Sequence, residues 1–266
     1  MPTDDHLSLD RPSPARMYDY FLHGDNNFEI DRAAAEQVIA KVGERLTRDV
    51  VWENRNFLGR VVRHLAEDCG ITQFIDVGAG LPSQENTHQV ARRAVPDARV
   101  VYVDNDPIVA AHGQTLLSAE DRELTRIITA DLRDPQAILD HPETAEVIDF
   151  SKPVAVLLIA VFHFVKDSER PGELVAAFRD RMAPGSYLAL SHLSTHDSPA
   201  EERAKMEDSY KNATAPMVFR DLPEIEKLFD GFTLTAPGLV PVGRWQPGVE
   251  QGESVRRMYG GVARLS

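Results

Sequence analysis

Residues 74–82 read FIDVGAGLP, an apolar segment followed by a glycine-rich turn and a proline. The run before the turn has the apolar, β-branched character of a buried strand, and Pro82 suits the first turn of a helix. Glycines let a backbone turn tightly and approach a ligand closely, and a helix N-terminus favours electron-rich groups. The stretch predicts a strand–turn–helix unit, although the same turn is equally typical of connections that bind nothing.

The segments around this unit repeat the alternation of strand and helix. Short apolar segments predict five strands, at residues 73–77, 99–103, 125–129, 154–162 and 186–192. Helical patterns separate them, at residues 84–95, 107–117, 135–147 and 172–182. Strands of nearly continuous apolar character that alternate with helices indicate a parallel sheet covered on both faces.

The last part of the chain has a different pattern. Two further strands are expected at residues 233–236 and 259–265, and the proline- and glycine-rich loop between them has no helical pattern. A parallel return needs a crossover of about a dozen residues or more, so this pair should be antiparallel. We therefore expect an α/β fold with a mostly parallel seven-stranded sheet and an antiparallel C-terminal strand pair.

The N-terminal region differs from the rest in its helical periodicity. Residues 15–66 carry apolar side chains at three- and four-residue spacing, whereas residues 1–14 contain three prolines and several acidic residues. We expect an extended arm over residues 1–14 and a single domain over residues 15–266. Within that domain, residues 15–70 would form a helical cap and residues 71–266 the α/β core.

Composition excludes several classes of protein. The 266 residues carry a formal net charge of −13, which disfavours nucleic acid as a partner. The single cysteine, Cys69, excludes an intrachain disulfide and a zinc site built on several thiolates. The most apolar run, residues 154–162, is far shorter than a bilayer-spanning helix, and the N-terminus has no secretory pattern. We expect a cytoplasmic protein without a membrane partner.

Acidic residues follow two more of the predicted strands. Asp104 ends the second strand, twenty-four positions after Gly80, and Asp131 with Leu132 follows the third. An acidic residue about twenty positions beyond the glycines can accept hydrogen bonds from ribose hydroxyls. Asp131 would accept from an adenine amino group while Leu132 packs on the ring. Either carboxylate alone could be a helix cap, but ligands of open α/β sheets bind beyond the carboxyl ends of the strands.

Asp76 separates two kinds of ligand. A dinucleotide pyrophosphate at the glycine turn would be repelled by a carboxylate two residues before the first glycine. An aminoacyl sulfonium carries an ammonium and a sulfonium cation, which the same carboxylate attracts. The dinucleotide fingerprint also expects a third glycine, where this chain has Leu81 and Pro82. The residues favour the sulfonium over a nicotinamide or flavin dinucleotide.

These motifs resemble a known superfamily. Asp76-Val77-Gly78-Ala79-Gly80, with Asp104, Asp131-Leu132, His163 after the fourth strand and Ala183-Pro184-Gly185 before the fifth, is similar to the class I S-adenosylmethionine-dependent methyltransferases. More narrowly, residues 14–28 (PARMYDYFLHGDNNF) and 80–88 (GLPSQENTH) resemble an actinobacterial methyltransferase-like family once catalogued as a domain of unknown function. The match covers about residues 12–265, and Pro82 departs from the third glycine that is common in the superfamily.

The resemblance implies a Rossmann-like fold and S-adenosylmethionine as methyl donor, with no metal. The expected cofactor-binding residues are Asp76, Gly78, Ala79, Gly80, Asp104, Asn105, Asp131, Leu132, Ala160, Arg16 and Tyr18. Arg16 and Tyr18 belong to a polar and aromatic cluster with Tyr20, His23 and Asn26. We interpret that cluster as a lid whose arginine or tyrosine contacts the cofactor carboxylate; the alternative is an arm that docks its aromatics on the core.

His163 is the candidate catalytic residue. A base is needed only if the acceptor must lose a proton, and an unperturbed histidine suits that transfer. The alternative is a histidine that packs on the cofactor without titrating. The predicted function is methyl transfer to a small-molecule acceptor, near which a helix at residues 200–211 should lie. Two alternatives stay open: a non-catalytic cofactor-binding sensor and, less favoured, a nicotinamide oxidoreductase.

Overall fold

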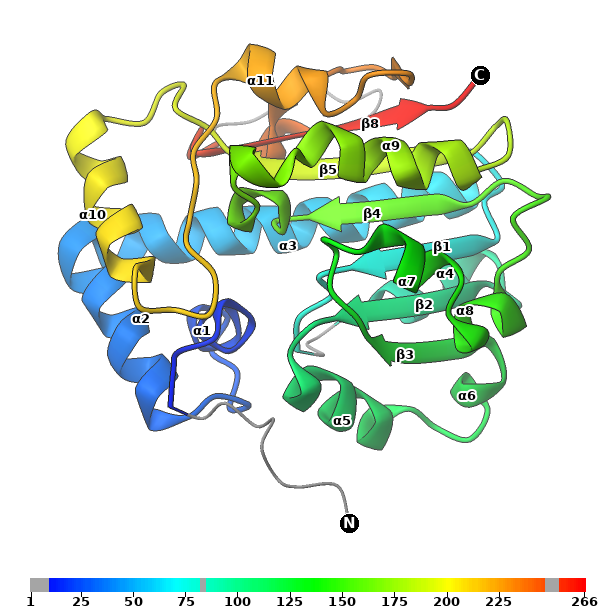
Figure 1. The fold of residues 1–266 in the computed structure, drawn as a ribbon, viewed down its shortest axis with the longest axis horizontal. Helices are drawn as coiled ribbons and strands as arrows, with labels where there is room; N and C mark the ends of the chain where they lie inside the picture. Colours follow the sequence, from blue (N-terminus) through cyan, green and yellow to red (C-terminus); the bar gives the residue numbers. More distant parts are fainter. Residues whose placement is uncertain (1–9, 82–84, 247–253) are drawn as a thin grey trace.

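A mixed sheet of eight strands lies at the centre of residues 10–81, 85–246 and 254–266, which the computed structural model describes (Figure 1). The strands are β1 (Gln73–Val77), β2 (Arg99–Asp104), β3 (Thr125–Thr129), β4 (Ala155–Ile159), β5 (Tyr187–Leu193), β6 (Thr233–Leu234), β7 (Val240–Pro241) and β8 (Met258–Arg264). Their order is β3-β2-β1-β4-β5-β8-β6, with β7 also paired to β8. Strands β1 to β5 pair in parallel, whereas β8 is antiparallel to β5, β6 and β7.

Helices cover both faces of the sheet and one of its edges. They are α1 (Pro14–Phe21), α2 (Glu29–Val42), α3 (Glu44–Glu67), α4 (Thr87–Ala94), α5 (Pro107–Leu116), α6 (Asp121–Leu124), α7 (Pro135–Leu139), α8 (Pro142–Val147), α9 (Pro171–Arg181), α10 (Ala200–Tyr210) and α11 (Leu222–Lys227). Short 3-10 turns form η1 (Phe162–Phe164), η2 (Asp167–Glu169) and η3 (Val242–Arg244). In Figure 1, α3 passes behind the sheet and α9 lies in front of it.

Two apolar cores result from the alternation of side chains along the strands. Neighbouring residues of a strand point to opposite faces, so Phe74 packs in one core and Ile75 in the other. The first core contains the apolar side of α3, including Phe57 and Leu65, and the second contains Phe178 of α9. Because both faces are buried, the parallel strands have the continuous apolar sequence from which they were predicted.

The cap helices lie across the carboxyl ends of the parallel strands. In Figure 1, α1, α2 and α10 gather beyond the end of the sheet to which the β4 arrow points. Helix α2 packs against both α1 and α10, and α3 contacts α4 and β4. The cap therefore covers the edge at which an α/β sheet binds its ligands.

Two predicted elements and the predicted number of strands differ from the structure. The strand expected over 154–162 ends at Ile159, because Ala160 adopts a left-handed φ of 54° and the chain turns into η1. The helix expected over 135–147 is broken into α7 and α8 ahead of Pro142, which has no N–H to continue the first helix. The two-residue strand β7 makes eight strands where seven were expected.

The predictions for the N-terminal arm and for Pro82 fall largely outside the described residues. Residues 1–9 and 82–84 belong to those segments, and α1 already begins at Pro14, the last residue of the expected arm. The helix expected from residue 84 is described from Thr87. No helix in the described part of the chain has the length and apolar character that crossing a membrane requires.

Candidate functional site

The glycine-rich turn after β1 is fixed by bonds to the neighbouring strand. The N–H groups of Gly78 and Ala79 donate to the carbonyl oxygen of Val103 at 2.8 and 3.1 Å. Gly78 has a φ of 71°, and a Cβ there would lie 2.4 Å from Cγ2 of Val161, so packing as well as conformation requires glycine. Gly80 has a φ of 66°, but a Cβ would meet open space. The backbone at Gly80 is therefore approachable.

Asp104 connects this turn to β2. Its side chain is only 7% exposed, and its two oxygens accept hydrogen bonds from the N–H groups of Gly80 and Asp106, each at 2.9 Å. Burial raises the pKa of Asp104 to about 6, against the effect of these hydrogen bonds. The carboxylate predicted for ribose is thus joined directly to the turn predicted for the cofactor.

Asp76 lies in β1, just before the glycine turn, and is buried. The hydroxyl of Thr87 donates to its Oδ2 at 2.6 Å. Burial raises the pKa of Asp76, while the Thr87 hydrogen bond and the charge of Arg55 oppose that rise. A buried carboxylate with one hydroxyl donor favours a cationic group beside it over a phosphate.

A single cavity at this edge of the sheet brings together all but two of the predicted site residues. Its lining includes Asp76, Gly78, Ala79, Gly80, Asp104, Asn105, Leu132, Ala160, Tyr18 and His163. A second cavity, between α4 and α5, shares Asp76, Ala79, Gly80 and Asp104 with the first. The glycine turn and the carboxylates of Asp76 and Asp104 therefore line both cavities.

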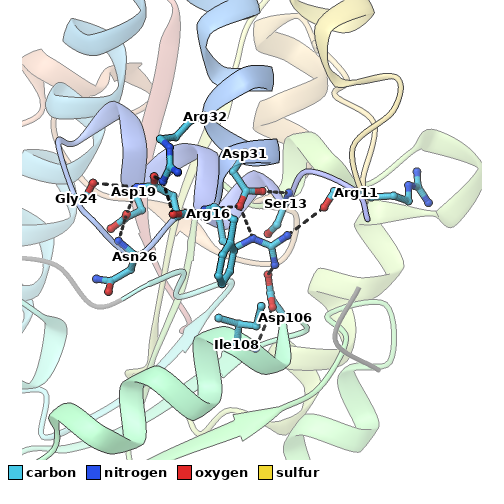
Figure 2. A network of polar contacts seen from close by, with 12 residues as sticks. Arg11, Ser13, Arg16, Asp19, Gly24, Asn26, Asp31, Arg32, Asp106 and Ile108 are labelled. Atoms are coloured by element: carbon cyan, nitrogen blue, oxygen red, sulfur yellow. Dashed lines mark hydrogen bonds and ion pairs between the residues drawn. The ribbon is translucent and has the colours of Figure 1, made fainter. Parts of the chain in front are cut away.

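Arg16 is the first exception. It is 2% exposed and lies between Asp31 and Asp106, with Nε 2.8 Å from Oδ2 of Asp31 and Nη1 2.9 Å from Oδ2 of Asp106 (Figure 2). Its Nη2 donates to the carbonyl oxygen of Arg11 at 3.1 Å. The guanidinium thus binds groups of the chain itself, and it joins α1 to α2 and to the start of α5.

Asp131 is the second exception. It is half-exposed at the end of β3, where its Oδ1 lies 3.1 Å from Nη1 of Arg133. Arg133 also binds Glu169, with Nε 2.6 Å from Oε1. Leu132 and Arg133, rather than Asp131, line the cavity.

The segment interpreted as a lid forms α1 and the loop to α2, and of its polar cluster Tyr18 alone lines the cavity among the described residues. The Tyr18 hydroxyl donates to the carbonyl oxygen of Val51 at 3.1 Å and accepts from Nδ2 of Asn54 at 3.0 Å. The next links are Ser191 Oγ to Oδ1 of Asn54 at 2.7 Å and Ala160 N to Ser191 Oγ at 2.9 Å. This chain of bonds ties the cap to the ends of β4 and β5 and supports the left-handed backbone of Ala160.

His163 lies in η1, 3% exposed, and its buried Nδ1 has no hydrogen-bond partner among the described residues. Its ring centroid is 5.7 Å from that of His192, whose Nε2 accepts from Nη1 of Arg220 at 2.7 Å. Arg220 in turn binds Asp167, with Nη2 2.7 Å from Oδ1. Burial, His192 and Arg220 together hold the pKa of His163 well below its usual value. The imidazole is therefore neutral, and the same environment makes it a weaker base than a free histidine.

The cavity also contains residues that the sequence did not single out. Asn54 and Arg55 reach it from α3, and Glu202, Met206 and Tyr210 reach it from α10. The four-residue spacing along α10 places those three side chains on one side of the helix. The spacing could have predicted that these residues share one side of the helix, but the charged residues between them favoured a solvent-exposed helix. Among the described residues no group of three His, Cys, Asp or Glu side chains is placed to hold a metal ion.

Comparisons with known proteins agree with this geometry. The family model described as S-adenosyl methyltransferase matches residues 2–266. A crystal structure from Thermobifida fusca YX, of a protein assigned as a methyltransferase, has 38% identity and a TM-score of 0.90 over 98% of this chain and 97% of that chain. A DUF574 family protein from Streptomyces avermitilis MA-4680 has 35% identity and a TM-score of 0.91, over 98% and 100% of the two chains.

A more distant structure shares the fold. Human N-acetylserotonin methyltransferase in complex with S-adenosylmethionine has 15% identity and a TM-score of 0.50, over 92% of this chain and 62% of that chain. A comparison with curated proteins found no significant match. The family match over nearly the whole chain makes this protein an S-adenosylmethionine-dependent enzyme of class I methyltransferase fold. The chain belongs to the S-adenosyl methyltransferase family.

Proposed function

We propose that this methyltransferase acts on a small molecule bound beneath its cap, with the cofactor held at the glycine turn. The observation that carries the proposal is the hydrogen bond from Gly80 N to Asp104, because it forms one wall of the cavity that His163 also borders. The cap helices enclose this cavity, and the net charge of −13 disfavours nucleic acid as the acceptor.

The residues at the turn fit S-adenosylmethionine. The open space at Gly80 lets the backbone approach a ligand, and Asp104 has lone pairs left for ribose hydroxyls. Leu132 offers an apolar surface to adenine, and Asp76 offers a carboxylate to the ammonium and the sulfonium. When bound, the cofactor supplies a methyl group activated by positively charged sulfur.

Arg55 is the residue we assign to the cofactor carboxylate, in place of Arg16. It lines both cavities, its charge acts on Asp76, and its Nη2 donates to the carbonyl oxygen of Glu85 at 2.9 Å. Both ion pairs of Arg16, to Asp31 and to Asp106, are made with the chain itself. Tyr18 and Ala160 would then line the cavity without binding the cofactor carboxylate.

His163 would accept the proton that the acceptor loses. It borders the cavity, and burial together with His192 and Arg220 keeps it neutral. As methyl transfer converts the sulfonium to a neutral thioether, the positive charge of the site moves to this imidazole. Burial and the nearby cations oppose a lasting positive charge on His163, so the imidazole would pass the proton on rather than keep it.

Transfer of tritium from methyl-labelled S-adenosylmethionine tests the proposal. The acceptors offered are panels of small phenols, alcohols and amines, together with bulk protein and RNA. We expect label in a small molecule and a rate about 10²–10⁴-fold lower for His163→Gln. S-adenosylhomocysteine should bind the variant as tightly as it binds the wild type.

His112→Gln, on the outer helix α5 and outside both cavity linings, is the matched control and should transfer label at the wild-type rate. Label found in protein or RNA would overturn the small-molecule acceptor. An unchanged rate in His163→Gln would remove His163 as the base. Cofactor binding with no label in any fraction would favour the sensor function.

A further inference from the structure

The part of the cavity farthest from the glycine turn, which we call the acceptor chamber, is enclosed by one side each of α2, α3 and α10. Val38 and Val42 of α2, Val50 of α3 and Met206 of α10 line it. The lining residues on each helix are spaced three or four positions apart, so whole helix faces are turned toward the chamber. Its surface contrasts with the carboxylates and backbone N–H groups at the cofactor end.

The chamber is apolar and adaptable. Three methionines border it, Met206, Met217 and Met258, and Phe21 and Phe164 add aromatic surface. Methionine side chains are flexible and make favourable contacts with aromatic rings. Walls of this kind bind a flat apolar body better than a sugar, a peptide or a polyamine.

Two polar groups interrupt this apolar surface without partners of their own. Tyr210 is 5% exposed and lines the cavity, and burial, with no contribution from a hydrogen bond to a described residue, raises the pKa of its hydroxyl. The Nδ1 atom of His163 is also without a hydrogen-bond partner among the described residues. The ring centroid of Phe164 lies 4.5 Å from that of His163 and 5.9 Å from that of Tyr210. Buried polar groups are usually paired, so both point to a ligand. The Tyr210 hydroxyl can donate or accept a hydrogen bond, and a neutral His163 has one ring nitrogen that accepts.

The charges in the chamber do not suit a cationic acceptor. Apart from Asp76 and Asp104 at the cofactor end, Glu202 is the one carboxylate among the described residues that line the cavity. Arg257 binds both oxygens of Glu202, with Nε 2.7 Å from Oε1 and Nη2 3.2 Å from Oε2. An ammonium entering the chamber would therefore lose its water without gaining an anion.

We propose that the methyl acceptor is a flat, apolar aromatic compound whose phenolic hydroxyls are held by Tyr210 and His163. The proposal rests on the proposed function, because it assigns the substrate class of the same site. A phenol donates and accepts hydrogen bonds, as these two side chains require. Phenols ionise near pH 10, about six units below water, so a neutral imidazole removes their proton more readily than that of an alcohol.

The transfer then balances within the site. The phenolic oxygen forms a bond to the methyl carbon while the carbon–sulfur bond breaks and leaves its electron pair on sulfur. The phenolic proton passes to a ring nitrogen of His163 and then to solvent. The products are a methyl ether, a neutral thioether and a proton.

The test uses 2,7-dihydroxynaphthalene as the probe and (2-naphthyl)methylammonium as the cationic comparison. Calorimetry measures the binding of each to protein saturated with S-adenosylhomocysteine, and mass spectrometry follows methyl ether formation with S-adenosylmethionine. We expect the diol to bind at least tenfold more tightly than the ammonium. Tyr210→Phe should weaken diol binding about tenfold, the effect of losing one buried hydrogen bond.

Met206→Gln makes the apolar wall polar and should weaken the diol without changing the affinity for S-adenosylhomocysteine, which also shows that the variant is folded. The matched controls are Tyr259→Phe, whose hydroxyl contacts Asp197 at 3.1 Å outside the chamber, and Lys205→Gln on the outer side of α10. Both should bind the diol as the wild type does.

The outcomes separate this inference from the function on which it rests. Equal or tighter binding of the ammonium, or an unchanged diol affinity in both Tyr210→Phe and Met206→Gln, would overturn the phenolic acceptor. The same holds if S-adenosylhomocysteine binds and the diol does not. Failure of S-adenosylhomocysteine itself to bind would overturn the proposed function and this inference with it.

Discussion

Asp104 has a structural role at the end of β2 and is also the residue that we propose binds the ribose. It ends β2, accepts from Gly80 N and is buried in the cavity wall. Only its ionised form offers both oxygens as acceptors to a ribose, and burial raises its pKa to about 6. Affinity for the cofactor should therefore depend on pH in a range where most carboxylates are fully ionised.

The sign of that dependence follows from the raised pKa. As the pH falls through about 6, the native carboxyl takes up a proton, so the form able to bind becomes scarcer. We expect S-adenosylhomocysteine to bind about tenfold more weakly at pH 5 than at pH 7.5, measured by calorimetry. Asp104→Asn should bind weakly at both values. A flat profile in the wild type would contradict this role for Asp104.

At the scale of elements, the Arg16 network holds the cap on the core. Arg16 in α1 bridges Asp31 of α2 and Asp106 at the start of α5, and Asp106 N in turn donates to Asp104 (Figure 2). Asp31 also accepts from the N–H groups of Ser13 and Phe28, at 2.9 and 3.0 Å. The network links the position of the cap to the cofactor wall.

Arg16→Met leaves the carboxylate of Asp31 buried beside an apolar chain. Removing one partner of a buried ion pair costs about 3–5 kcal/mol, so the free energy of unfolding in urea should fall by that amount. Arg16→Lys should also lose stability, because an ammonium cannot bridge two carboxylates as a guanidinium does. If Arg16 instead serves the cofactor, as the sequence predicted, Arg16→Lys would keep its stability and lose affinity for S-adenosylhomocysteine.

The sequence predicted helices and strands well where the pattern of neighbouring residues determines them. The strand–turn unit at Asp76–Gly80 and the carboxylate of Asp104 depend on residues close in the chain, and the structure brings them together. The partners of Arg16 could not be read in this way, since Asp106 lies ninety positions away. The end of β4 was missed because a hydroxyl from β5, Ser191, supports the left-handed backbone of Ala160.

The acceptor side of the site was less predictable, again for a physical reason. Helix α10 carries alternating charges, such as Glu201 and Lys205, and so reads as a solvated helix. Which side of α10 faces inward is decided by its packing against α2 and over the cavity, and local sequence does not show that packing. The sequence predicted from its place in the chain that this helix lies near the acceptor, but it did not single out Met206 and Tyr210, which line the cavity.

At the scale of the whole molecule, the ligand should stabilise cap and core as one unit. The cavity is lined by both parts, so a bound molecule contacts both. At a concentration one hundred times its Kd, S-adenosylhomocysteine should raise the free energy of unfolding by about 2.7 kcal/mol. Circular dichroism and the fluorescence of Trp52 and Trp245 should follow the same transition. Two separated transitions, with only one shifted by the ligand, would contradict a single domain over residues 15–266.

We propose that the corner formed by Asp76, Gly78, Gly80 and Asp104 accepts a sulfonium nucleoside and rejects a diphosphate. Titration calorimetry at pH 7.5 with S-adenosylmethionine and then with NAD tests it directly. We expect binding of the first and none of the second. Asp104→Ala should lose about 1–3 kcal/mol of binding free energy, whereas Asp134→Ala, at the exposed cap of α7, should lose none. Tight binding of NAD, or an unchanged affinity in Asp104→Ala, would contradict the claim.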